Sequence, residues 1–164
     1  MLDRLTRVCD RIIEYSFYSL FLLVPLIFTP WNFELFEFNK MFLTYFLTAI
    51  IAGAFVTRSI LDRGIKLVRT PLDIPILLFL LAMVISTIYS IDMHTSVWGY
   101  YSRFNGGLAS ILCYIALFYV FVNTMDLRKT YKTIIVSLIA GFLVILWGLP
   151  SHFGYDPSCL LFSG

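Results

Sequence analysis

Five apolar stretches, each close to the length needed to cross a bilayer, divide the chain. They occupy residues 12–30, 41–61, 74–90, 107–125 and 134–149, with short polar connectors between them. A run of roughly 20 apolar residues spans the hydrocarbon core as an α-helix, and a helix satisfies its backbone hydrogen bonds internally, as lipid requires. The sequence therefore predicts an all-α fold, a polytopic membrane helix bundle with about five transmembrane helices in a single domain, residues 1–164.

The composition excludes an ordinary water-soluble domain. Of the 164 residues, 60% are hydrophobic and 13% are charged, and the mean hydropathy is +0.87. Soluble domains carry about 25% charged residues, and a small domain leaves much of its surface in contact with water. Residues 1–14 are rich in charge, and the apolar run after them lacks a small-residue cleavage site, so we expect a retained first span rather than a signal peptide.

Lysine and arginine are unevenly distributed between alternate connectors. Of the 12 such residues, only Lys40 and Arg103 lie in the connectors after the first and third spans. The other ten precede the first span or flank the second-to-third and fourth-to-fifth connectors: Arg4, Arg7, Arg11, Arg58, Arg63, Lys66, Arg69, Arg128, Lys129 and Lys132. Short cytoplasmic connectors carry the excess of these cations. The distribution predicts a cytoplasmic N-terminus and places Lys40 and Arg103 on the outer side.

The outer loop of residues 96–107 is the most unusual segment. It gathers Trp98, Tyr100 and Tyr101 around Arg103, with glycines that allow sharp bends. An arginine can bind a phosphate through two hydrogen bonds, and aromatic rings can stack on a sugar. We expect these four residues to bind substrate. The alternative is an interfacial aromatic belt with an arginine reaching toward the headgroups.

The other outer cation, Lys40, lies near Glu34 and Glu37. The functional interpretation makes Lys40 a substrate-binding residue in a charged pocket wall, and the alternative is a solvated ion pair.

No motif points to a cofactor. His94 and His152 lie on the predicted outer side near Asp92 and Asp156, but their spacing matches no metal-binding pattern. The chain has no phosphate-binding P-loop, dinucleotide-binding glycine motif, or hydrolase or zinc-protease motif. We therefore expect no metal and no cofactor. The basic clusters are short, and topology and lipid headgroups account for them without nucleic acid.

Several short segments together resemble a known membrane family. They are residues 36–40, 70–73, 90–92 and 96–106, of which the most specific is the pattern Trp-Gly-Tyr-Tyr-x-Arg-x-x-Gly that begins at Trp98. Over most of residues 15–157 the chain resembles the N-terminal part of the bacterial O-antigen ligase and O-antigen polymerase-like membrane proteins.

The resemblance implies a glycosyltransferase that takes a glycan from undecaprenyl diphosphate at the outer face of the bacterial inner (cytoplasmic) membrane. The acceptor would be a lipid, another glycan or a protein, and membrane lipids would surround the helices. Family members have further spans and a large periplasmic loop that holds the catalytic arginines and histidine. By this resemblance the chain is an N-terminal fragment, inactive alone, with its catalytic residues expected beyond residue 164.

Two other classes of protein fit the same composition. A fragment of a membrane transporter or flippase would show paired spans broken by glycine or proline in an inverted repeat, which the five predicted spans lack. A non-catalytic membrane scaffold would not depend on Arg103.

Overall fold

The computed structural model describes residues 2–27, 37–62, 64, 67–100 and 103–153. Over these residues the secondary structure is six α-helices and no strand, which confirms the all-α prediction. The helices are α1 (Leu2–Leu26), α2 (Glu37–Leu61), α3 (Asp73–Ile88), α4 (Met93–Trp98), α5 (Leu108–Thr124) and α6 (Leu127–His152).

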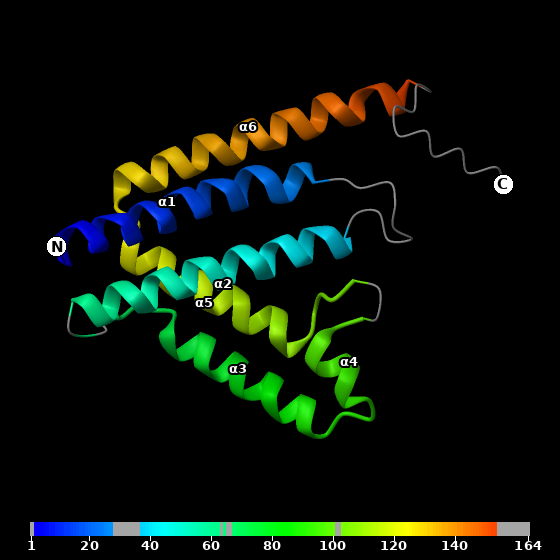
Figure 1. The fold of residues 1–164 in the computed structure, drawn as a ribbon. Coiled ribbons are helices and arrows are strands. Elements are labelled where there is room, and N and C mark those ends of the chain that lie inside the picture. Colours follow the sequence, from blue (N-terminus) through cyan, green and yellow to red (C-terminus); the bar gives the residue numbers. More distant parts are fainter. Residues whose placement is uncertain (1, 28–36, 63, 65–66, 101–102, 154–164) are drawn as a thin grey trace.

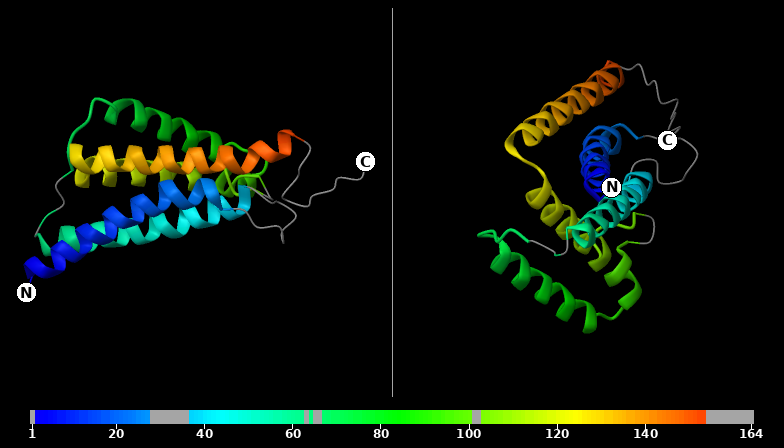
Figure 2. Two further views of the ribbon diagram at one scale, coloured as in Figure 1. Left: turned by 90° about the horizontal axis from the view of Figure 1, so that it is seen from above. Right: turned by 60° about the vertical axis from the view of Figure 1, so that its left-hand side comes forward.

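Five helices correspond to the five apolar runs and alternate in direction along the chain (Figure 1). α1 packs between α2 and α6, while α5 packs against α2 and α3, so the spatial order is α6–α1–α2–α5–α3. Figure 2 shows that this row curves without closing into a ring, with α3 and α6 at its two edges. The short helix α4 lies beside α3 and α5.

A small apolar core joins the three central helices. Ile13 and Phe17 of α1, Ile51 of α2 and Val120 of α5 form it, all nearly inaccessible to solvent. Ile13 and Phe17 are four residues apart and so lie on the same face of the helix. The ring of Phe17 meets that of Phe121 edge to face, with centroids 5.3 Å apart. Most other apolar side chains face outward, as expected where lipid is the solvent.

Two helices, α2 and α6, are long and apolar enough by themselves to cross a bilayer. α3 and α5 are apolar but have only 16 and 17 residues. At 1.5 Å per residue they extend about 25 Å, against a hydrocarbon core of about 30 Å. In α1, Asp10, Arg11 and Glu14 fall within the last 18 residues of the helix, so its uncharged part is short.

Two predicted boundaries of the fifth apolar segment were wrong. Residues 127–133, expected in a connector, form the start of α6, because the Asp126 carboxylate accepts a hydrogen bond from the Lys129 backbone N–H at 3.0 Å and caps the helix. The predicted span ends at residue 149, yet α6 continues through Pro150 to His152. Proline has a helix-compatible φ, and near a helix end it removes only one backbone hydrogen bond.

The alternating helix directions collect the basic residues at one end of the row. The N-termini of α1, α3 and α6 and the C-termini of α2 and α5 lie together at the left of Figure 1. Eight of the ten clustered cations are described there, whereas Arg63 and Lys66 lie outside the described residues. Lys40 and Arg103 belong to the opposite end, so the charge asymmetry of the sequence becomes an asymmetry between the two ends of the fold.

Ion pairs at the basic end connect α1 to its neighbours. Arg58 of α2 contacts Asp10 at 3.0 Å, and Lys129 of α6 contacts Glu14 at 3.3 Å. All four side chains are about one-fifth to one-third exposed, so solvent screens these pairs only partly.

Candidate functional site

Close backbone packing closes the loop between α4 and α5. Gly99 has φ +88°, and a Cβ there would meet the backbone of Asn105, 2.7 Å from its carbonyl carbon and closer to its oxygen. A Cβ on Gly107 would likewise meet the backbone N of Gly99 and, at 2.7 Å, the carbonyl carbon of Trp98. The two ends of the loop therefore touch through their main chains, and only glycine leaves room for this.

A capping residue organises the short helix before the loop. The Asp92 carboxylate accepts hydrogen bonds from the backbone N–H groups of His94 at 3.1 Å and Thr95 at 3.3 Å, and from the Thr95 hydroxyl. The Thr95 side chain contributes most to lowering the pKa of Asp92, followed by the backbone donors. The cap therefore requires the ionised carboxylate and orients α4, whose last residue leads into the loop.

Two tyrosines and a phenylalanine hold the loop against α2 and α5. The Tyr45 hydroxyl donates to the Phe104 carbonyl oxygen at 2.9 Å, and the Tyr114 hydroxyl lies 3.2 Å from Asn105 Oδ1. The Phe104 ring meets that of Phe38 edge to face, at 5.6 Å between centroids. Phe104 has a positive φ of 51°, a conformation that non-glycine residues seldom adopt. These contacts stabilise the strained residue next to Arg103.

Arg103 lies at the rim of an open polar hollow. Its Nε is 3.4 Å from Oε2 of Glu37 in the first turn of α2, and its guanidinium lies 6.0 Å from the centroid of the Tyr100 ring. The side chain is about half exposed. The hollow, about 560 Å³, is lined by Glu37, Tyr100, Arg103, Asn105 and Gly106. It offers cationic donors, a carboxylate acceptor and an aromatic ring, a set that can bind a phosphate or a sugar hydroxyl.

The other predicted site residues are distributed around this hollow. Trp98 lines a smaller apolar hollow of about 230 Å³, together with His94 and the loop residues Gly99 and Phe104. Lys40 lines a separate groove of about 430 Å³ between α1, α2 and α6, where Leu143 and Trp147 supply apolar walls. Tyr101 lies outside the described residues. The structure thus brings Arg103 and Tyr100 together, with Trp98 nearby and Lys40 elsewhere.

Sequence reasoning missed Glu37 as the partner of Arg103. It grouped Glu37 with Lys40 and Glu34, which are close in sequence, and Glu34 lies outside the described residues. Glu37 and Arg103 are 66 positions apart. The sequence did contain a signal for this pair: Glu37 and Arg103 both belong to the predicted outer side, where few charges of opposite sign are available to pair.

No metal site accompanies the hollow in the part of the chain that the structure describes. Within that part, no three histidine, cysteine, aspartate or glutamate side chains are placed to share a metal ion.

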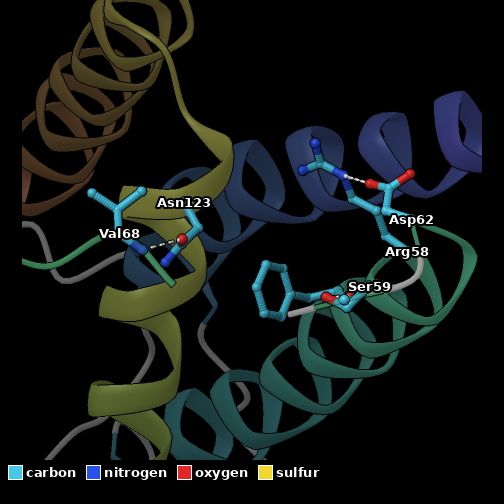
Figure 3. Close-up of a pocket in the computed structure, with 7 residues that line it drawn as sticks. Arg58, Ser59, Asp62, Val68 and Asn123 are labelled. Carbon is cyan, nitrogen blue, oxygen red and sulfur yellow. Dashed lines mark hydrogen bonds and ion pairs between the residues drawn. The ribbon is translucent and has the colours of Figure 1, made fainter. Parts of the chain in front are cut away.

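A second polar hollow lies at the basic end, lined by residues of α2 and α5 and by Gly64 and Val68 (Figure 3). It measures about 500 Å³. The backbone N–H of Val68 donates to Asn123 Oδ1 at 2.8 Å, which attaches the connector to α5. Arg58 lies on its wall 3.6 Å from Asp62 and also contacts Asp10. Since two carboxylates flank this arginine, the hollow carries no excess positive charge, and the attachment of the connector is a structural role.

Comparison with known proteins finds no matching family model, no matching curated protein and no matching solved structure. The resemblance of residues 98–106 to the O-antigen ligase-like family therefore stays a prediction. The hollow beside Arg103 lies at the end of the fold opposite the basic clusters.

Proposed function

We propose that this chain is the N-terminal membrane portion of a glycan ligase or polymerase that uses a lipid carrier. In this proposal five helices span the bacterial inner membrane, with the N-terminus in the cytoplasm. The enzyme transfers a glycan from undecaprenyl diphosphate to an acceptor at the outer face. The chain supplies part of the carrier-binding surface, and we assign no catalytic base to it.

One observation carries the proposal: the hollow of Arg103 and Tyr100 lies at the end of the fold opposite the basic clusters. With those clusters in the cytoplasm, Arg103 lies at the outer headgroup level, where the diphosphate of a membrane-embedded carrier is located. The tyrosine ring beside the guanidinium offers a stacking surface for the sugar attached to it.

The chemistry assigned to Arg103 is electrostatic. Breaking the glycosyl bond leaves the additional negative charge on the diphosphate. A guanidinium placed there beforehand stabilises that developing charge. In the structure Arg103 is paired with Glu37 at 3.4 Å. A diphosphate would compete with this carboxylate, so Glu37 opposes binding while it holds the arginine in place.

Two substitutions with opposite expected signs test the carrier site. We expect Arg103→Ala to weaken binding of undecaprenyl diphosphate by about 10- to 100-fold, because hydrogen bonds to a charged group contribute about 1.5–3 kcal/mol. Glu37→Gln removes the competing charge and should strengthen binding by up to about fivefold, since an exposed ion pair contributes about 0–1 kcal/mol. Undecaprenol, which lacks the diphosphate, should bind both variants and the parent chain equally. Microscale thermophoresis in detergent measures the affinity of the parent chain and of both variants for each of the two lipids.

Activity provides a second test. In the full-length gene product, Arg103→Ala should abolish or strongly reduce glycan transfer in cells, and Lys132→Gln at the basic end should not. Normal transfer by both Arg103→Ala and Arg103→Lys, at normal expression, would reject the role and favour the scaffold alternative. Labelling of an engineered cysteine at position 103 only from the cytoplasmic side would reject the orientation.

A further inference from the structure

The hollow beside α4 differs in character from the hollow of Arg103. Four described residues line it, His94, Trp98, Gly99 and Phe104, and almost all of its wall is carbon. His94 and Trp98 are four residues apart and therefore lie on one face of α4. Gly99 ends that helix with φ +88°, and Phe104 also has a positive φ, of 51°. Residues from both ends of the loop thus form one hollow of about 230 Å³, which we call the α4 hollow.

The α4 hollow lies at the end of the fold opposite the basic clusters (Figure 1). Tyr89, Ile91 and Met93, which lead into α4, each have more than half of their surface exposed, and Trp98 is about half exposed. Tryptophan and tyrosine are concentrated where the headgroups of a bilayer meet its hydrocarbon. In the proposed membrane orientation the α4 hollow therefore lies at the level where phosphate groups join lipid chains.

The walls of the α4 hollow suit a hydrocarbon group better than a sugar. Of the four lining residues, only His94 and Trp98 have side chains that can form a hydrogen bond. Each hydroxyl group of a sugar that is covered without a hydrogen-bond partner costs free energy. A hydrocarbon group has no such requirement, and contact with the aromatic walls removes its surface from water.

The α4 hollow and the hollow of Arg103 are formed by the same loop. Phe104, which lines the α4 hollow, directly follows Arg103 and precedes Asn105, and both of these line the other hollow. Gly99 likewise directly precedes Tyr100, and the main chains of Gly99 and Asn105 pack closely together. Consecutive Cα atoms are about 3.8 Å apart. One amphiphile can therefore place an anionic group at Arg103 and the carbon atoms joined to it in the α4 hollow.

We infer that the α4 hollow binds the first isoprene unit of the lipid carrier, the five-carbon group joined directly to the diphosphate. The inference rests on the proposed function, because it takes the diphosphate to lie at Arg103. It adds a contact that selects the lipid: Trp98 and Phe104 cover the isoprene unit, so a diphosphate without a hydrocarbon group binds less tightly.

Two soluble diphosphates test this site without the complication of long chains entering the detergent. Dimethylallyl diphosphate carries one isoprene unit, and methyl diphosphate carries a single carbon. Nuclear magnetic resonance titration of the chain in deuterated detergent measures both affinities. We expect the parent chain to bind dimethylallyl diphosphate about 10- to 30-fold more tightly, because each buried carbon contributes about fourfold and an open hollow covers about half of the four extra carbons. The methyl groups of the ligand should also show nuclear Overhauser effects to the Trp98 indole ring.

Substitutions at two tryptophans locate the effect. Trp98→Ala should lower the preference for dimethylallyl diphosphate to about threefold or less and leave the affinity for methyl diphosphate unchanged. Trp98→Leu keeps an apolar wall and should keep most of the preference. The matched control is Trp147→Ala, since Trp147 is 45% exposed against 47% for Trp98 and lines the groove of Lys40. This control should keep the full preference.

Several results would overturn the inference. If the parent chain binds both diphosphates equally, the isoprene contact is rejected while the carrier site at Arg103 stands. If neither diphosphate binds, or if Arg103→Ala binds both as the parent does, the proposed carrier site is rejected and the inference with it. An equal loss of preference in Trp147→Ala also rejects the α4 hollow.

Two further outcomes are decided by the nuclear Overhauser effects. If an equal concentration of dihexanoylphosphatidylglycerol removes them, the hollow accepts any lipid chain and the assignment to isoprene is wrong. If Trp98→Ala also loses methyl diphosphate, the substitution has disturbed the loop, and the effects in the parent chain decide. Their absence there would reject the contact, and their presence would support it.

Discussion

Replacing Gly99 by alanine tests whether close backbone packing holds the loop that presents Arg103. Gly99 has φ +88° and ψ −176°, a conformation essentially restricted to glycine. A Cβ at this position would also overlap backbone atoms of Asn105. Backbone atoms cannot rotate out of the way as a flexible side chain can, so the loop itself would have to move.

The expected cost has two parts. The backbone conformation alone costs a non-glycine residue about 1–3 kcal/mol, and an extra methyl group in a packed site typically costs a further 1–3 kcal/mol. Gly106 separates the cost of the backbone conformation from the cost of overlap, because it has φ +82° but no atom lies within 4 Å of where an added Cβ would be. Gly106→Ala should therefore cost only about 1–2 kcal/mol. Gly53, in an open position within α2, is a neutral control, since alanine favours a helix by up to about 1 kcal/mol.

Limited trypsin digestion measures how often the loop between α4 and α5 opens, because Arg103 is a trypsin cleavage site within that loop. Cleavage of a transiently open segment follows the open population, and each 1.4 kcal/mol changes that population tenfold. We expect cleavage after Arg103 to accelerate by about 30-fold or more in Gly99→Ala, by about 5- to 30-fold in Gly106→Ala, and not at all in Gly53→Ala. Cleavage of Gly99→Ala no faster than that of Gly106→Ala would refute the role of backbone packing.

Two further predictions concern the cap of α4 and the attachment of α6. Asp92→Ala removes the N-cap and should unwind α4, seen as a shift of the Thr95 amide resonance. The pKa of Asp92 is lowered, so the stability that its carboxylate contributes is present above the ordinary value of 3.8 and is lost as the pH falls through the lowered pKa. Acid should therefore reproduce the same resonance shift in the parent chain and produce none in Asp92→Ala. A double-mutant cycle of Glu14→Gln and Lys129→Met should give a coupling of about 0.5–1 kcal/mol in detergent unfolding, since both side chains are mostly covered, and a coupling near zero would show that the pair does not hold α6 to α1.

Local patterns in the sequence were sufficient for the five long helices, but not for α4, whose residues Met93–Trp98 were expected in a loop. The length and continuity of the apolar runs predict five long helices, because helix formation depends on neighbouring residues and their backbone hydrogen bonds. Alternating connectors predict alternating directions, and with them the collection of basic residues at one end. The predicted helix boundaries were wrong where a single side chain sets them. Asp126 caps α6, which begins seven residues earlier than the apolar pattern indicates.

The site depended on tertiary packing. Glu37 meets Arg103, and Tyr45 meets the carbonyl of Phe104, only because α2 packs against α5. Lys40 is three residues after Glu37 and only about 60° around the helix from it, yet it lines the groove toward α6 and not the hollow of Arg103. The sequence alone thus determined which residue types occupy each end of the helices, through local periodicity and charge. Which of those residues touch was decided by contacts between helices distant in sequence, which no local pattern encodes.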